Sequence, residues 1–170
     1  EKLGTTPDAA TSPYNYFWEL LKGSEAWTAA TKDIRGVSNG SFYTLFIPAN
    51  TAIMQAVKDG YLPGDVNTGM PDFPASAQTP AEKLQVERFI QYHFIDRRTV
   101  AADGIEIGAL PTILKTSIGD AVTVTVYNNP GSIQIVDNNG RTSNVISAPT
   151  NYIGNRIMIH LIDNYLQYTL

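Results

Sequence analysis

Two histidines are the side chains that could carry acid–base or ligand chemistry near neutral pH. His93 lies on the apolar side of a helical pattern, and His160 lies inside the apolar run 157–162. Asp163 follows closely and could complete a hydrolase triad with a serine. However, positions 160 and 163 point to opposite faces of a strand, and the sequence has no Gly-x-Ser-x-Gly nucleophile turn. We therefore interpret both histidines as buried side chains that hydrogen-bond to backbone.

Metal and cofactor chemistry has few candidate residues. The chain has no cysteine, which excludes disulfides and thiolate ligands, and two histidines make a poor zinc site. The segment 137–140, Asp-Asn-Asn-Gly, resembles a calcium loop only superficially, because it lacks alternating ligands and a terminal Glu. We interpret it as a hairpin turn and expect no catalytic residue, metal or cofactor.

Aromatic residues are a further group that could bind a partner. The chain has nine tyrosines and two tryptophans, and we expect several to lie in loops or on outer faces. Such side chains provide large, stiff contact areas and can stack on sugars. We select Trp18, Tyr61 and Tyr152 as candidate contacts. The alternative is that some aromatic side chains fill the core while others are scattered singly on the surface.

Composition predicts one globular domain. The chain has 170 residues, of which 43% are hydrophobic and 16% charged. Its net charge is −4, and the densest basic spot is the pair Arg97-Arg98, so nucleic acid and anionic membranes are disfavoured partners. No apolar run approaches the roughly 20 residues needed to span a bilayer. We expect a linker over 1–11, a single domain over 12–170, and any membrane tether outside this chain.

Three helices are predicted by capping signals and helical spacing. The first has Ser12 as N-cap and Pro13 as its first residue, and the second is capped by Asn50. The third begins with a capping box over 79–82 and directs five side chains to the core: Leu84, Val86, Phe89, Ile90 and His93. The segment 60–79 is rich in Gly, Pro, Asp and Ser and is predicted to be a long surface loop.

Strands are predicted mostly in the second half of the chain. An early strand covers 41–47 and ends at Pro48. Alternation over 122–127 and the turns that follow predict a β-meander that continues to 147. The last strand, 157–162, is apolar on both faces, which indicates a central position with both faces covered. Helices followed mainly by antiparallel strands predict an α+β fold.

Three segments together resemble the fasciclin (FAS1) family over roughly residues 14–167. The first is 44–53, which includes Phe46, Pro48 and Asn50. The second is Tyr92-His93, and the third is 157–166, which includes His160 and Asp163. The resemblance implies antiparallel β-sheets forming a wedge or sandwich, with several helices packed on one side. It also implies that Tyr92 and His93, the family's Tyr-His motif, are candidate binding determinants.

The function implied by this resemblance is a non-catalytic binding or adhesion module, extracellular or at the cell surface. The expected partner is an extracellular protein, and the chain would be tethered by a segment outside it, as in a bacterial surface lipoprotein. The alternative is a cell-surface glycan as partner, and a hydrolase is disfavoured. Animal family members bind integrins partly through an Asp-Ile pair just before the last strand. That pair is missing over 148–153, so integrin recognition does not carry over.

Overall fold

The computed structural model of this chain describes residues 11–31, 33–38, 40–146, 152–154 and 156–170, with the backbone alone for 152–154. In these residues the helices are α1 (Asn15–Gly23), α2 (Asn50–Lys58), α3 (Pro80–Tyr92) and a short 3-10 helix, η1 (Ala75–Ala77). The strands are β1 (Trp27–Thr28), β2 (Asp33–Ile34), β3 (Tyr43–Pro48), β4 (Gly64–Asp65), β5 (Met70–Pro71), β6 (Phe94–Asp96), β7 (Gly108–Lys115), β8 (Ala121–Asn129), β9 (Ser132–Val136), β10 (Thr142–Asn144), β11 (Tyr152–Gly154) and β12 (Ile157–Ile162).

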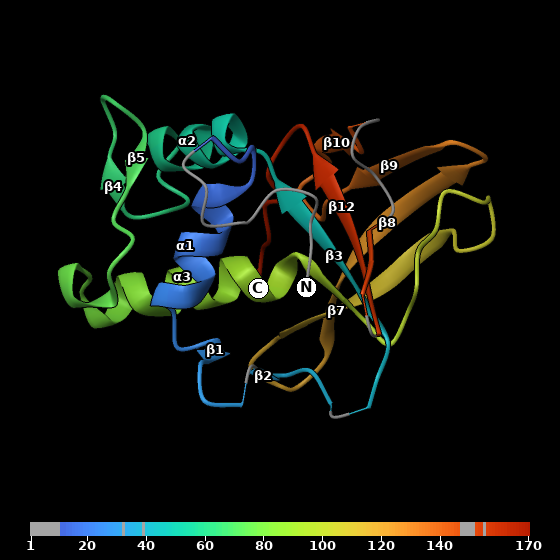
Figure 1. Cartoon of the computed structure of the whole chain (residues 1–170), viewed down its shortest axis with the longest axis horizontal. Coiled ribbons are helices and arrows are strands. Elements are labelled where there is room, and N and C mark those ends of the chain that lie inside the picture. Colours follow the sequence, from blue (N-terminus) through green and yellow to red (C-terminus); the bar gives the residue numbers. More distant parts are fainter. Residues whose placement is uncertain (1–10, 32, 39, 147–151, 155) are drawn as a thin grey trace.

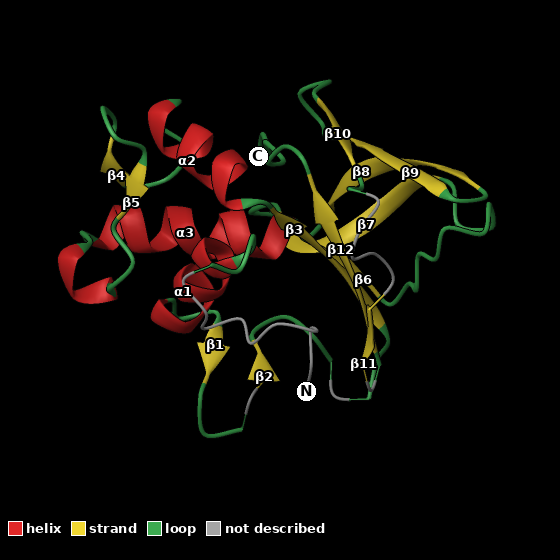
Figure 2. Cartoon of the chain, turned by 45° about the horizontal axis from the view of Figure 1, so that its top comes forward, coloured by secondary structure: helices red, strands yellow, loops and turns green. Residues whose placement is uncertain are grey.

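Eight strands of the described residues form one mixed sheet in the order β10-β9-β8-β7-β6-β3-β12-β11. Neighbouring strands are antiparallel except β3 and β12, which run parallel and place Phe46 opposite His160. The helices gather on one side of the molecule, and β7 to β10 extend away from them (Figures 1 and 2). This is the predicted α+β architecture, including the meander from β8 to β10.

The two strands β3 and β12 separate two apolar cores. Leu45 and Ile47 of β3 pack into a core shared with the three helices. Phe46, between them in sequence, packs into a second core with side chains of β7, β8 and β9. Successive side chains of a strand point to opposite faces, so the two cores lie on opposite faces of β3. Ile162 of β12 also enters the second core, while Leu161 enters the first, as expected for a strand apolar on both faces.

The starts of α1 and α2 differ from the prediction. The N-cap of α1 is Tyr14 rather than Ser12, and the N-cap of α2 is Ala49, so Asn50 is already inside its helix. The Asn50 side chain instead caps the neighbouring helix, because its Oδ1 accepts the Tyr16 backbone N–H at 3.0 Å. Its Nδ2 donates to the Ser12 carbonyl at 2.8 Å. A sequence pattern cannot reveal this contact, because its partners lie 34 and 38 residues away.

Two further predictions are corrected by the structure. The segment 60–79 is not a plain loop, because it contains the β4–β5 hairpin and η1. It packs tightly on α1: a Cβ on Gly23 would lie 2.3 Å from the Phe73 carbonyl oxygen, so this position needs glycine. Leu84 of α3, predicted to face the core, is exposed, whereas Val86, Phe89 and Ile90 are buried as predicted.

The predicted capping box at the start of α3 is confirmed. The Thr79 hydroxyl accepts the Glu82 backbone N–H at 3.3 Å, and the Glu82 carboxylate accepts the Thr79 N–H at 2.6 Å. We predict that Thr79→Ala lowers the free energy of unfolding by about 1 kcal/mol. Urea unfolding followed by circular dichroism measures this, with Thr51→Ala, an exposed threonine of α2, as the control. Equal midpoints in the two variants would contradict the prediction.

Candidate contact surface and the buried histidines

His93 is the C-cap of α3 and has no exposed surface. Its Nδ1 lies 2.7 Å from the Phe89 carbonyl oxygen, which can only accept, so Nδ1 carries the proton. Nε2 is then free to accept, and the Leu166 backbone N–H donates to it at 3.1 Å. The ring is thereby held as one neutral tautomer between α3 and the C-terminal segment. The interpretation of His93 as a buried, backbone-bonded histidine is confirmed.

The surroundings of His93 favour its neutral form. Burial lowers the pKa of His93 to about 4, although the bond to the Phe89 carbonyl acts in the opposite direction. The rings of Phe17 and Phe89 pack against the imidazole, with centroids at 5.8 and 4.4 Å. Protonation would place two N–H donors, Nε2–H and the Leu166 N–H, against one another. A proton-transfer role for this ring is therefore disfavoured by its contacts.

His160 is also buried and bonded to backbone. Its Nε2 donates to the Val100 carbonyl at 2.6 Å, and its ring stacks on Phe46 with centroids 5.6 Å apart. Burial lowers the pKa of His160, while the bond to Val100 opposes this shift. Asp163, the other triad candidate, accepts the Asn144 backbone N–H at 2.7 Å instead. His160 and Asp163 therefore form hydrogen bonds with different parts of the backbone and not with one another as a triad would.

Tyr92 lies beside His93 and is fully buried. Its hydroxyl donates to the Thr123 carbonyl at 3.0 Å and accepts the Asn138 backbone N–H at 3.0 Å. These bonds join the end of α3 to β8 and to the turn after β9. Because neither Tyr92 nor His93 has surface to offer, neither can contact a partner directly in this conformation. Any effect of the Tyr-His motif on binding must act through the position of the segments it joins.

The segment 137–140 is the hairpin turn between β9 and β10, as predicted. Asp137 is buried, and its Oδ1 accepts the backbone N–H groups of Asn139 and Arg141 at 3.0 and 2.8 Å. Its Oδ2 accepts the Gln167 N–H at 2.8 Å, which ties the C-terminal segment to the turn. The Asp137 carboxylate thus accepts hydrogen bonds from three backbone N–H groups. Among the described residues, no three His, Cys, Asp or Glu side chains are grouped as metal ligands would be.

Two of the three candidate aromatic contacts are half-buried and packed within the chain. The Trp18 ring meets Trp27 edge-on with centroids 5.8 Å apart. Tyr61 packs on Tyr165 with centroids 5.7 Å apart. The side chain of Tyr152 lies outside the described residues, although its backbone pairs with Ile159. The structure therefore does not bring these three residues together into one described surface.

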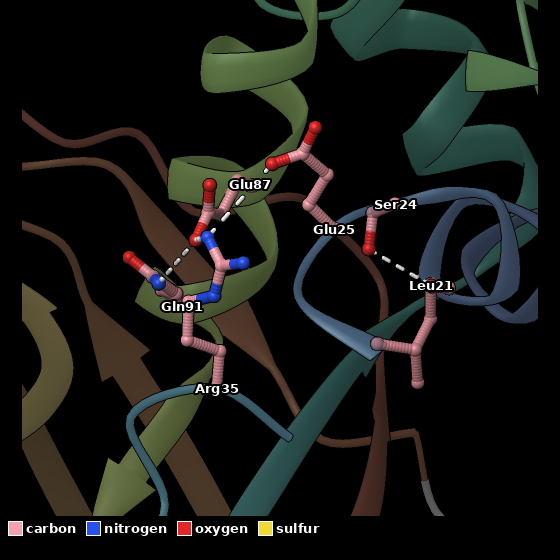
Figure 3. Close-up of polar contacts among 6 residues, drawn as sticks. All are labelled: Leu21, Ser24, Glu25, Arg35, Glu87 and Gln91. Carbon is pink, nitrogen blue, oxygen red and sulfur yellow. Dashed lines mark hydrogen bonds and ion pairs between the residues drawn. The ribbon is translucent and has the colours of Figure 1, made fainter. Parts of the chain in front are cut away.

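A group of ion pairs beside α3 helps to hold the fold together (Figure 3). Arg35, which follows β2, lies 3.2 Å from the Glu87 carboxylate and 3.9 Å from that of Glu25. Glu87 also accepts from the Gln91 side chain at 3.2 Å. These contacts clamp the β1–β2 hairpin against α3, and Glu87 is largely covered. The carboxylates are used to hold the fold together.

An apolar surface that the sequence reasoning missed lies on the exposed side of β7 and β8. Ile107, the residue before β7, and Tyr127 of β8 are 60% and 55% exposed, and they adjoin the pair of Gly108 with Val126. Ile105, two residues before Ile107, is also exposed. We call Ile105, Ile107 and Tyr127 the outer apolar face. The strict alternation of buried and exposed residues in β8 could have predicted this surface, because it places Tyr127 on the face away from the buried valines.

Comparison with known proteins assigns the family. Residues 24–168 match the model of the fasciclin domain, so the chain belongs to the fasciclin domain family, whose members are generally adhesion-type modules. The resemblance seen in the sequence is confirmed. No curated protein sequence matches the chain at a significant level.

A solved structure supports the same fold. The chain is similar to a FAS1 domain pair from the insect cell adhesion molecule fasciclin I, with a TM-score of 0.51 and 14% sequence identity. The match covers 89% of this chain and 44% of that chain, so this chain spans less than half the length of the pair. At this identity the similarity concerns the fold alone.

The lowered pKa of His93 predicts pH-dependent stability. An unfolded histidine titrates near pH 6.5, so between about 6.5 and 4 the unfolded state binds more protons. The free energy of unfolding should therefore fall as pH decreases through this window, by about 3 kcal/mol from His93. Urea unfolding at pH 7 and pH 4.5 measures the change. His93→Gln, which can keep both bonds without titrating, should show a smaller decrease, and an equal decrease would contradict the assignment.

His160 carries a separate stability prediction. His160→Ala removes the stacked ring and leaves the Val100 carbonyl without its donor, so we expect a clearly lower melting temperature. A loss of about 3 kcal/mol is typical when a large buried ring is truncated. Differential scanning calorimetry measures it. An unchanged melting temperature would show that the ring is not an essential part of the second core.

Proposed function

We propose that this chain is a non-catalytic adhesion-type binding module in an extracellular or cell-surface setting, and that it contacts a protein partner through the outer apolar face. The family supports the adhesion role, because fasciclin domains are generally modules of this kind. The observation that supports the contact surface is the exposure of Ile107, the residue before β7, and of Tyr127 in β8, next to the pair Gly108 and Val126.

The chemistry of this face suits protein recognition. Tyrosine is enriched among residues that dominate interface energies, and the cores of interfaces are apolar. Polar side chains surround it: Thr125 and Gln134 lie on the same side of β8 and β9, because Tyr127 pairs with Gln134 and two-residue steps share a face. An apolar centre with a polar rim is the usual anatomy of a protein contact.

Several observations support a non-catalytic role. Both histidines are buried and bonded to backbone carbonyls, so neither is placed to exchange protons with a substrate. The glycan alternative that rests on Trp18 and Tyr61 is less well supported, because both rings pack within the chain. None of the described helices combines the length and apolar character that crossing a bilayer requires.

A binding screen with surface variants tests the proposal. The purified chain is presented by biolayer interferometry to immobilised matrix and cell-surface proteins. For a protein that binds, the double variant Ile107→Ser/Tyr127→Ala should weaken the affinity by about tenfold or more. Ile118→Ser is the matched control, because Ile118 is 84% exposed at the separate turn between β7 and β8.

Two results would argue against the proposal. One is a folded sample that binds none of the proteins. The other is a bound partner whose affinity is unchanged in the double variant, which would move the contact surface elsewhere. Circular dichroism of each variant establishes that the fold is intact, which we expect because all three substituted side chains are exposed.

A further inference from the structure

Three neighbouring strands bring two arginines and a phenylalanine to one end of the sheet. Tyr43 of β3 lies opposite Asp96 of β6 and also opposite Ile157 of β12. One residue beyond this row, Phe42 therefore lies between Arg97 and Arg156. Strands in a sheet are about 4.8 Å apart, which places the backbones of the two arginines roughly 10 Å apart. We call Phe42, Arg97 and Arg156 the arginine rim.

Both arginines have a backbone conformation that favours glycine. Arg97 has φ 55° and Arg156 has φ 76°, and among the described residues they are the two non-glycine positions with positive φ. A Cβ is strained there, and arginine lacks the short polar side chain that makes Asn or Asp tolerable. Arg156 lies in the turn between β11 and β12, where positive φ is usual, and Arg97 directly follows β6. Glycine would satisfy either conformation without a Cβ, yet both positions carry arginine. At the arginine rim, the shared property of the two strained residues is the guanidinium group.

The two guanidinium groups approach one loop from different strands. Arg97 Nη2 donates to the Ser38 hydroxyl at 3.4 Å. Arg156 Nη1 would lie 3.6 Å from a Cβ built on Gly40, two residues further along the same loop. Phe42, at the end of this loop, is 59% exposed. The rim therefore presents two cationic groups together with an exposed aromatic ring.

The backbone that carries Arg97 is held from inside the protein. The Thr44 hydroxyl donates to the Arg98 carbonyl and accepts the Val100 N–H, both at 2.9 Å. His160 bonds to the Val100 carbonyl. The segment after β6 is thus fixed to β3 and β12 by buried side chains, which keeps the rim in place without a partner.

The acidic side chains nearby leave most of the positive charge of Arg97 and Arg156 available to a ligand. Asp96 lies 3.9 Å from Arg97, and Glu106 lies 3.8 Å from the adjacent Arg98. Burial raises the pKa of Tyr43, while the charge of Arg156 lowers it and that of Asp33 raises it, so both charges act near this ring. Both ion pairs are long, and the Arg97 and Arg98 side chains are 69% and 54% exposed, so the pairs contribute little energy and a ligand anion can compete with them. Arg156 forms no ion pair within the described part of the chain.

We propose that the arginine rim binds an acidic polysaccharide, through its carboxylate or sulfate groups. Guanidinium groups suit such anions because they can donate two parallel hydrogen bonds, and the Phe42 ring can stack on a sugar face. A polysaccharide carries its anionic groups at regular intervals and can repeat a small contact along its chain, so two guanidinium groups and one ring suit it.

The chain has a net charge of −4, so only the surface close to the two arginines can attract an anionic polysaccharide. At physiological ionic strength the screening length is about 8 Å, so an anionic chain senses mainly the nearest guanidinium groups. The acidic side chains elsewhere on the protein repel the polysaccharide. This site differs in residues and ligand from the outer apolar face and does not depend on the protein contact proposed there.

The test uses heparin, polygalacturonate, neutral dextran and poly-glutamate, each immobilised for biolayer interferometry at two salt concentrations. We expect heparin or polygalacturonate to bind with salt-sensitive affinity and dextran not to bind. The double variant Arg97→Gly/Arg156→Gly should lose about tenfold or more in affinity. Its melting temperature should be unchanged or higher, because glycine removes the strain. Lys58→Ala/Lys115→Ala, which removes two exposed charges elsewhere, should bind as the parent chain does.

Four results would overturn the proposal. The first is no binding to either acidic polysaccharide at low salt. The second is binding that the glycine double variant retains, or that the lysine control loses equally, since the contact would then be elsewhere or a general charge effect. The third is binding to poly-glutamate alone, which would assign the rim to an acidic protein segment. A lower melting temperature in the glycine variant with unchanged affinity would likewise show that the arginines serve the fold.

Discussion

The hydrogen bonds of His93 are the constraint on which the rest of this structure depends. The ring nitrogens bond to Phe89 in α3 and to Leu166 after β12, while the His93 backbone carbonyl accepts the Phe46 N–H of β3. A single residue thus joins a helix, the strand that separates the two cores, and the C-terminal segment. Because the site is fully buried, each of these bonds is formed where water cannot replace it. The neutral tautomer is therefore part of the fold.

The C-terminal segment shows what this constraint achieves. After β12 the chain has no regular structure, so its backbone needs partners from elsewhere. Leu166 bonds to His93, Gln167 bonds to Asp137, and Thr169 bonds to Asn138. The Tyr165 hydroxyl donates to Asp59 at 2.6 Å at the end of α2. The segment thereby joins the β9–β10 turn, α2 and α3 into one body.

The sequence predicted local features well and long-range features poorly, for a physical reason. The capping box of Thr79 and Glu82 and the alternation of β8 depend on neighbouring residues, so their patterns are visible in the sequence. The capping of α1 by Asn50 joins residues 34 positions apart, and the parallel pairing of β3 with β12 joins more distant ones. Such contacts arise only once the chain has folded. The same limit explains the candidate site. Tyr92 and His93 were recognised by motif and His93 was predicted to be buried, but the burial of Tyr92 and the distant partners of both side chains were visible only in three dimensions.

The most direct test of the central claim is the state of the His93 ring in solution. Long-range ¹⁵N–¹H NMR of the side chain reports which ring nitrogen carries the proton and at what pH the ring titrates. The account predicts a proton on Nδ1, a bare Nε2 and no titration until the pH approaches about 4. A proton on Nε2, or titration near the ordinary histidine value of about 6.5, would contradict it, because the ring could then not accept the Leu166 N–H that anchors the C-terminal segment.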